Sequence, residues 1–248
     1  RCVAGFAHFL NQLGVRSGRV ALICNNSIEM VIAMFAVHAA GAQVVPINPM
    51  YTTRELSHIL DDAEPLVIIY DAVLAKTLEP ISAELKIPHN YRIEEQVGAS
   101  MGSWRLDADI ELPQPLPKAT DLATLQYTGG TTGLPKGVNI THGQMSINIS
   151  QREAVLPTHK DEEVILCVMP LFHVFAVSMC LHLAAYCRGE LLILPRYKPN
   201  LVFDAISNKH VTRLPAGPTV FIGLMRAEGF ADTDFSKLRT AYSGSAPL

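Results

Sequence analysis

One stretch of twelve residues organises this chain: Tyr127-Thr128-Gly129-Gly130-Thr131-Thr132-Gly133-Leu134-Pro135-Lys136-Gly137-Val138. It contains four glycines, three threonines and one lysine. Glycine lets the backbone turn sharply and approach a ligand closely. Threonine hydroxyls and backbone N–H groups donate hydrogen bonds, and a lysine ammonium adds a compact positive charge. The stretch therefore predicts a loop that binds a polyanion, most obviously the phosphates of a nucleotide.

Two common nucleotide-binding patterns do not match this stretch. In the phosphate loop G-x-x-x-x-G-K-[ST] the lysine follows glycine and precedes serine or threonine. Here Lys136 follows Pro135 and precedes Gly137. The dinucleotide pattern G-x-G-x-x-G also fails. The alternative interpretation is a glycine-rich surface turn with an incidental lysine. Ordinary turns need only one or two residues such as glycine or proline, so an ordered run of this length disfavours it.

Composition places the chain among globular proteins. Its 248 residues are 49% hydrophobic and 17% charged, enough for one large domain or two modest ones with a sizeable core. A net charge of −3 and a pI near 6.3 argue against a nucleic-acid partner. The five cysteines are scattered without C-x-x-C spacing, which predicts buried free thiols in a reducing compartment and a cytoplasmic location.

Strand-like and helix-like segments alternate through the first third of the chain. Helical spacing or capping signals predict helices over 3–13, 28–40 and 52–62, and apolar runs predict strands over 19–24, 43–47 and 66–70. Residues 71–110 show no clear period. The alternation predicts an α/β fold with layered, largely parallel sheets and flanking helices.

A Pro-rich segment divides this pattern. We expect a first α/β unit over 1–110, an extended connector over 111–120 and a second unit over 121–248 that carries the glycine-rich stretch. That stretch is expected to join two extended segments, with a helix over 141–152 soon after. Further strands are predicted over 164–169, 190–194, 211–214 and 239–243, with helices over 200–210 and 218–229.

The uncharged run 171–187 requires a choice between two structures. Its 17 residues reach the lower limit for spanning a bilayer. It contains His173, Ser178 and His182 and lies between strand-like runs. We therefore predict a buried helix of a soluble core rather than a transmembrane span.

Three further segments carry candidate chemistry. Pro170-Leu171-Phe172-His173 lies at a strand-to-helix turn, where His173 could also be a core histidine with a satisfied hydrogen bond. Ser243-Gly244-Ser245-Ala246-Pro247 could let a flat ring approach the backbone or be an ordinary strand-ending turn. Gly217 and Pro218 could leave space for a ligand or simply begin a helix. No paired metal-ligand spacing and no G-x-S-x-G elbow are present, which disfavours a zinc site and a serine hydrolase.

Taken together, the glycine-rich stretch, the Pro-Leu-Phe-His segment and the turn at 243–247 resemble the adenylate-forming (acyl-CoA synthetase, AMP-binding) superfamily. The nearest resemblance is to bacterial long-chain fatty-acyl-CoA ligases, which share the run 125–133. The resemblance implies the large N-terminal domain of the acyl-CoA synthetase-like fold. Because the chain begins inside an apparent helix and stops after an apparent strand, we expect a fragment truncated at both ends. The magnesium-binding glutamate, the ribose-binding aspartate and the C-terminal domain of such enzymes would then lie downstream of Leu248.

The resemblance also implies a reaction. The parent enzyme would activate a carboxylic acid, here a medium- or long-chain fatty acid, with ATP and Mg²⁺ to acyl-AMP and pyrophosphate. Coenzyme A would then form the acyl thioester, and the isolated fragment is expected to be inactive. An aryl-acid (coumarate-like) CoA ligase and a non-catalytic nucleotide- or acyl-binding homologue are the alternatives. An unrelated phosphotransferase conflicts with Pro135 and with the Pro-Leu-Phe-His segment. A fatty-acid ligase could contact membranes peripherally, although nothing basic and amphipathic here indicates it.

Site residues follow from the same resemblance. The ATP phosphates would contact Thr128, Gly129, Gly130, Thr131, Thr132, Gly133 and Lys136. Phe172, His173, Gly217 and Pro218 would border the acyl pocket, with His173 near the reacting carboxylate. Gly244, Ser245, Ala246 and Pro247 would lie against adenine, and no metal ligand is expected in this chain. Ser245 stands where glycine is common in the family, and serine would be strained there if the position needs a positive φ.

Overall fold

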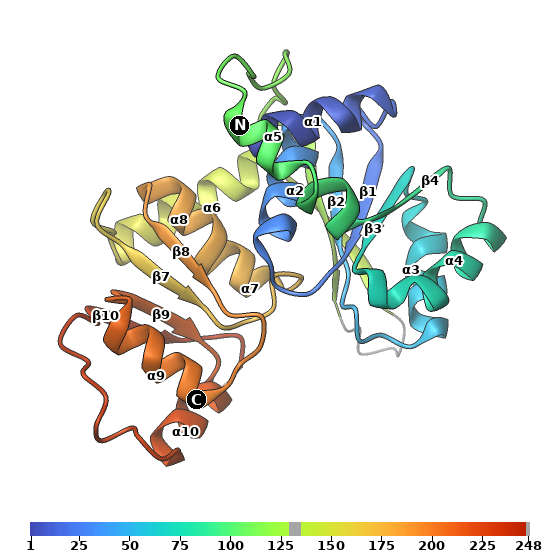
Figure 1. The fold of residues 1–248 in the computed structure, drawn as a ribbon. Helices are drawn as coiled ribbons and strands as arrows, with labels where there is room; N and C mark the ends of the chain where they lie inside the picture. Colours follow the sequence, from blue (N-terminus) through green and yellow to red (C-terminus); the bar gives the residue numbers. More distant parts are fainter. Residues whose placement is uncertain (129–134, 247–248) are drawn as a thin grey trace. The chain divides into compact units, whose positions relative to one another are not determined.

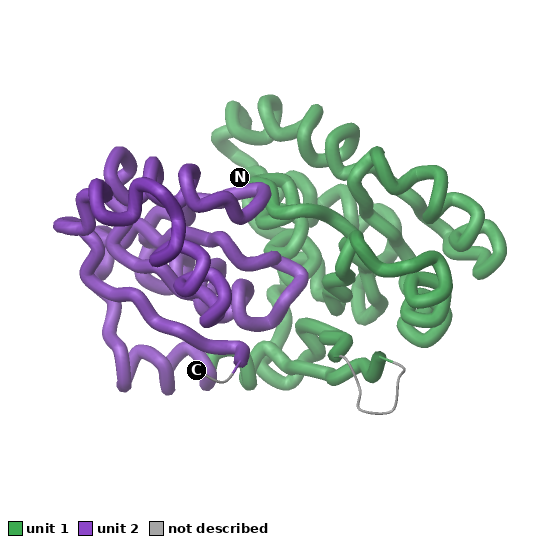
Figure 2. The backbone as a smooth tube through the Cα atoms, turned by 90° about the horizontal axis from the view of Figure 1, so that it is seen from below, with its two compact units in different colours: residues 1–146 green, residues 147–248 purple. Residues whose placement is uncertain are grey.

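The computed structural model describes residues 1–128 and 135–246 (Figure 1). By compactness the chain divides into a first unit, Arg1–Ser146, and a second unit, Ile147–Leu248 (Figure 2). Each unit contains one sheet with helices packed against it, so the predicted α/β class is confirmed.

The first unit is built on a six-stranded sheet in the order β4-β3-β1-β2-β5-β6. Its strands are β1 (Arg19–Ile23), β2 (Gln43–Pro46), β3 (Val67–Tyr70), β4 (His89–Arg92), β5 (Leu122–Thr128) and β6 (Lys136–Thr141). All neighbours pair in parallel except β5 and β6, which are antiparallel. The central strands are continuous apolar runs because helices cover both faces of a parallel sheet.

The helices of the first unit are α1 (Cys2–Gln12), α2 (Ile28–Ala39), α3 (Thr53–Ala63), α4 (Ala75–Glu84) and α5 (Met101–Leu106), with the short turns η1 (Ala72–Leu74) and η2 (Glu94–Gly98). Of these, α2 and α3 begin where the capping signals predict. The Ser27 hydroxyl accepts a hydrogen bond from the Met30 N–H at 3.0 Å and begins α2. Thr52 and Glu55 form the predicted capping box of α3.

The hydrophobic periodicity of the sequence did not predict β4 and α4, which lie within residues 71–110. β4 is a half-buried edge strand that reads His-Asn-Tyr-Arg and shows no apolar alternation. α4 contains Pro80 and buries only Leu78, Ile81 and Ser82. Edge strands and short helices bury few side chains, so their hydrophobic pattern is weak.

The second unit holds a four-stranded parallel sheet in the order β10-β9-β7-β8. Its strands are β7 (Val164–Cys167), β8 (Glu190–Ile193), β9 (Arg213–Ala216) and β10 (Thr240–Ser243). The helices are α7 (Val174–Ala176), η3 (Val177–His182), α8 (Leu183–Cys187), α9 (Pro199–Asn208) and α10 (Pro218–Arg226). Residues from β7, β9, α9 and α10 form its apolar core, including Leu166, Leu214, Ile206 and Leu224.

The uncharged run 171–187 forms the predicted buried helix, with one difference in its geometry. It starts at Val174, and a π-helical turn, η3, separates the α-helical segments α7 and α8. Ala176, Cys180 and Leu183 are buried. Within residues 1–128 and 135–246, no helix is both long and apolar enough to cross a membrane.

The division of the chain differs from the prediction at 111–120. β5 pairs with β2 and β6 pairs with β5, so both strands beside the glycine-rich loop belong to the first sheet. The compact units separate after Ser146, inside α6 (His142–Val155). Local pattern shows that 121–126 is extended, but the partner of a strand depends on long-range packing. Leu125 and Tyr127 bury their side chains in the core of the first unit, which places β5 there.

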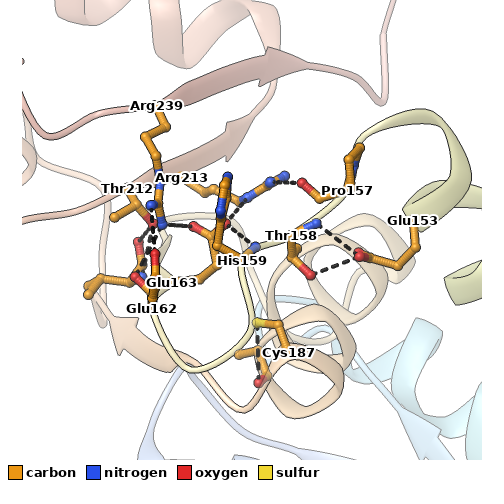
Figure 3. A network of polar contacts seen from close by, with 12 residues as sticks. Glu153, Pro157, Thr158, His159, Glu162, Glu163, Cys187, Thr212, Arg213 and Arg239 are labelled. Atoms are coloured by element: carbon orange, nitrogen blue, oxygen red, sulfur yellow. Dashed lines mark hydrogen bonds and ion pairs between the residues drawn. The ribbon is translucent and has the colours of Figure 1, made fainter.

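A buried ion-pair network fixes the amino-terminal ends of β7, β9 and β10 (Figure 3). The Glu163 carboxylate is 2.9 Å from the His159 N–H nitrogen, 3.0 Å from Arg213 Nε and 3.1 Å from Arg239 Nη2. The Thr212 hydroxyl also donates to it. Burial acts to raise the pKa of Glu163, but these hydrogen bonds outweigh it and lower the pKa to about 2. Glu163 therefore stays ionised and holds three strands together.

Candidate functional site

Three of the predicted segments meet at one edge of the second sheet. Residues 168–173 follow β7, residues 217–218 follow β9, and residues 244–246 follow β10. Because these strands are parallel, their carboxyl ends lie at the same edge, where α/β sheets bind ligands. The Gly244 N–H donates to the Ala216 carbonyl oxygen at 3.2 Å and links two of these segments directly.

Packing explains one of the two glycines at this edge but not the other. A Cβ on Gly244 would lie 2.5 Å from Cε2 of Phe175, so the phenyl ring packs directly on the backbone of residue 244. A Cβ on Gly217 would lie 3.8 Å from both the Gly244 carbonyl oxygen and Cε of Met169, an ordinary contact distance. Packing therefore requires glycine at 244, whereas Gly217 leaves a small open space.

His173 caps the helix that follows β7. Its Nδ1 accepts a hydrogen bond from the Phe175 N–H at 3.2 Å, which places the proton of the neutral ring on Nε2. The side chain is exposed, so His173 is not the core histidine that the sequence left open, and Phe172 beside it is half-buried. Its Nε2 is thus free of the local capping bond and can donate a hydrogen bond to an oxygen of a ligand.

Ser245 has the backbone conformation that the sequence marked as difficult for serine. Its φ is +70°, in the left-handed region that favours glycine. Ser245 and Ala246 are both exposed at the carboxyl edge. Pro247, the last residue predicted to contact adenine, lies outside the described residues.

The glycine-rich stretch begins and ends in a hairpin of the first unit. Thr128 ends β5, Lys136 begins β6, and the two residues are paired across the strands. Both are exposed at the carboxyl end of β5. The remaining predicted phosphate-binding residues, Gly129, Gly130, Thr131, Thr132 and Gly133, lie outside the described residues.

Packing on the sheet sets the base of this hairpin. A Cβ on Gly137 would lie 2.9 Å from Cδ1 of Leu125 and 3.3 Å from Cζ of Tyr127, so this glycine is required by strand packing. The Tyr127 hydroxyl donates a hydrogen bond to the Asp62 carboxylate on α3. Burial raises the pKa of the Tyr127 phenol, and the hydrogen bond to Asp62 raises it further. Tyr127 therefore anchors β5 as a neutral phenol.

Sequence reasoning missed the residues that support these segments. Phe175 lies within the uncharged run 171–187, but only the structure shows its ring on Gly244. Met169 borders Gly217, and the Tyr242 hydroxyl donates to the Met179 carbonyl oxygen at 3.2 Å. The sequence did not indicate the role of Asp62, because an acidic residue near a helix end usually indicates only a solvated surface.

A cavity of about 560 Å³ lies elsewhere, beside the edge strand β4 of the first unit. Its lining includes Tyr70, Glu79, Lys86 and Arg92. Arg92 is already paired with Glu79 at 3.3 Å and with Glu95 at 3.1 Å. None of the predicted site residues lines this cavity, so it is not part of the candidate site. In the described part of the chain, no group of three or more His, Cys, Asp or Glu side chains could hold a metal ion.

Comparison with known proteins supplies a family and several relatives. The family model for "AMP-binding enzyme" matches residues 1–248. The chain is 33% identical to the long-chain-fatty-acid–CoA ligase of Salmonella typhimurium, over 98% of this chain and 49% of that protein. It is 28% identical to 4-coumarate-CoA ligase 1 of Narcissus pseudonarcissus, over 96% of this chain and 45% of that protein.

A solved structure shows the same architecture. The inhibitor-bound N-terminal domain of FACL13 from Mycobacterium tuberculosis matches 100% of this chain and 62% of its own chain, with a TM-score of 0.87 and 28% identity. The chain spans about half the length of the curated relatives it matches.

Proposed function

The chain belongs to the AMP-binding enzyme family, and from this premise we propose that the whole protein is an ATP-dependent acid–thiol ligase. In the first step a carboxylate oxygen attacks the α-phosphorus of ATP, forming acyl-AMP and releasing pyrophosphate. In the second step the thiol of coenzyme A attacks the acyl carbon, forming a thioester and releasing AMP. The observation that carries this proposal is the meeting of the segments after β7, β9 and β10 at one sheet edge.

Lys136 and Thr128 serve the first step in this proposal. The attack brings two anions together, and the pyrophosphate leaves with increased negative charge. An ammonium and a hydroxyl at the paired ends of β5 and β6 would stabilise that charge and position the phosphates. Mg²⁺ would enter with ATP and neutralise part of the phosphate charge.

The acid would bind at the carboxyl edge of the second sheet. Gly217 leaves space beside Met169, and His173 presents an exposed ring whose orientation is set by its bond to Phe175. An Nε2–H donor near the carboxylate would hold one oxygen while the other attacks. Gly244, Ser245 and Ala246 would present backbone to adenine.

A fatty acid is the favoured acid, because the relatives with 30–33% identity are named long-chain-fatty-acid–CoA ligases. The 28% identity to a 4-coumarate-CoA ligase favours an aryl acid as the second candidate. The deciding experiment measures pyrophosphate release and CoA thioester formation by the full-length protein with dodecanoate, palmitate and 4-coumarate. Turnover of a fatty acid supports the first candidate, and selective turnover of 4-coumarate supports the second. ATP binding without turnover of any acid would refute the ligase and favour a binding homologue.

Substitution of Lys136 tests the phosphate-binding role separately. Lys136→Ala should lower kcat/KM for pyrophosphate release about 100-fold, as expected when a charge that stabilises the transition state is lost. Lys118→Ala removes another exposed lysine of the first unit and should leave the rate unchanged. Equal rates for the two variants would contradict the role of Lys136.

A further inference from the structure

The helix after β7 is interrupted by a π-helical turn, η3, which lies between α7 and α8. A π turn adds one residue to the α-helical ladder, so the segment before it is rotated by about 100° and one carbonyl oxygen loses its usual N–H donor. Such turns are rare and are found frequently at functional sites. The segment before η3 carries His173 and Phe175, which lie at the carboxyl edge of the second sheet.

Side chains from two other elements of the second unit complete the hydrogen bonding of this turn. Arg152, in the last turn of α6, donates from Nη1 to the Ser178 carbonyl oxygen. The same nitrogen lies 3.4 Å from Oγ of Ser178 and 3.6 Å from Sδ of Met179. The Ser178 hydroxyl donates to Oδ1 of Asn148, one turn earlier in α6, at 2.7 Å. From β10, the Tyr242 hydroxyl donates to the Met179 carbonyl oxygen at 3.2 Å.

Arg152 makes this bond at a cost in stability. Its Nε and Nη2 are buried and have no hydrogen-bond partner among the described residues. The three acceptors of Nη1 are all uncharged, so no carboxylate is bonded to the guanidinium. Burial accordingly lowers the pKa of Arg152. A methionine of similar length would avoid the cost of burying a cation, so stability alone does not account for an arginine here.

Two contacts, one helical turn apart, align this helix with β10. The Phe175 ring packs on Gly244, and the Met179 carbonyl oxygen accepts the hydrogen bond from Tyr242. Positions 175 and 179 lie on one face of a helix, and positions 242 and 244 lie on one face of a strand. Both contacts therefore form together in only one register of the helix. That register also sets where His173, at the start of the helix, lies.

We propose that Arg152 is a positioning residue that holds η3 in its π-helical register and so orients His173 toward the acid, an inference that rests on the proposed function. Without a donor at the Ser178 carbonyl oxygen, the helix would return to the α-helical register, in which a backbone N–H satisfies that oxygen. Residues 173–176 would then rotate by about 100° relative to α8. Phe175 would leave Gly244, and the ring of His173 would turn away from the bound carboxylate.

The test separates positioning from stability in three variants of the full-length protein. The acid is whichever of dodecanoate, palmitate and 4-coumarate the wild-type protein turns over best. Arg152→Met should lower kcat/KM for that acid about 100-fold, the effect of a misplaced reacting group, without lowering the thermal midpoint. The KM for ATP should stay unchanged, because the phosphate-binding hairpin of β5 and β6 belongs to the first unit. Arg152→Lys retains a cationic donor and should recover most of the lost rate. Arg226→Met, at an exposed arginine of α10, should change neither rate nor midpoint.

The outcomes distinguish this inference from the proposed function. A loss of kcat/KM for the acid at an unchanged midpoint, with recovery in Arg152→Lys, supports the inference. An unchanged rate in Arg152→Met overturns it, as does a fall in kcat that only follows a lower midpoint and leaves both KM values unchanged. A crystal structure of Arg152→Met with an intact π turn also overturns the inference alone. A wild-type protein that turns over none of the three acids refutes the proposed function and the role of Arg152 together.

Discussion

Replacing Glu163 by glutamine should destabilise the second unit strongly. The carboxylate is 1% exposed and accepts hydrogen bonds from His159, Thr212, Arg213 and Arg239. Arg213 is itself 3% exposed, so its guanidinium cannot exchange the lost partner for water. An amide in the same place has no charge, and its NH₂ group would face donors. The variant therefore leaves a buried cation without its counter-ion.

Two lines of reasoning give a similar magnitude for this loss of stability. The pKa of Glu163 is lowered to about 2, against an ordinary value of about 4.3, and this difference corresponds to about 3 kcal/mol. Removal of one partner from a buried ion pair typically costs about 3–5 kcal/mol. We therefore expect Glu163→Gln to lower the free energy of opening of the second unit by about 3 kcal/mol. Because the folded-state pKa is lowered, this contribution is present above about pH 4.3 and is lost as the pH falls towards 2.

Native-state hydrogen exchange resolved by mass spectrometry is the appropriate assay, because it follows β7 and β9 separately. The single tryptophan, Trp104, packs against Phe6 in the first unit, so its fluorescence reports the other unit. Glu162→Gln is the matched control, because Glu162 is 66% exposed and pairs with Arg239 at 3.3 Å. It should cost less than about 1 kcal/mol. Equal protection of β7 and β9 in the two variants would refute the reasoning.

Three smaller predictions follow from the packing of single residues. Gly244→Ala should displace Phe175 and cost about 1–3 kcal/mol of stability. Gly217→Ala should change stability very little. Equal denaturation midpoints for the two variants would contradict the packing argument. Burial lowers the pKa of His142, so the contribution of this side chain to the free energy of unfolding should be complete above about pH 6.5 and should fall below it. Denaturant titrations of His142→Gln should show a weaker dependence of stability on pH. Tyr127→Phe removes the hydrogen bond to α3 and should cost about 1 kcal/mol, measured by Trp104 fluorescence during unfolding.

Local chemistry accounts for what could be predicted about the elements. The capping box at Thr52 and Glu55, the apolar strands and the uncharged helix after His173 are each specified within a few residues. β4 was missed because a half-buried edge strand has no apolar alternation. The family and the candidate segments were also recognisable in advance, because glycines and threonines that serve a ligand appear as an ordered run.

The sequence by itself thus determined the α/β class, the family resemblance and the residues worth testing. Only the tertiary structure decided that β5 and β6 join the first sheet, and that the segments after β7, β9 and β10 share one edge. It also placed Phe175 on Gly244 and gave Ser245 its positive φ. Strand order and backbone strain arise from contacts between residues far apart in the chain, and no local period records those contacts.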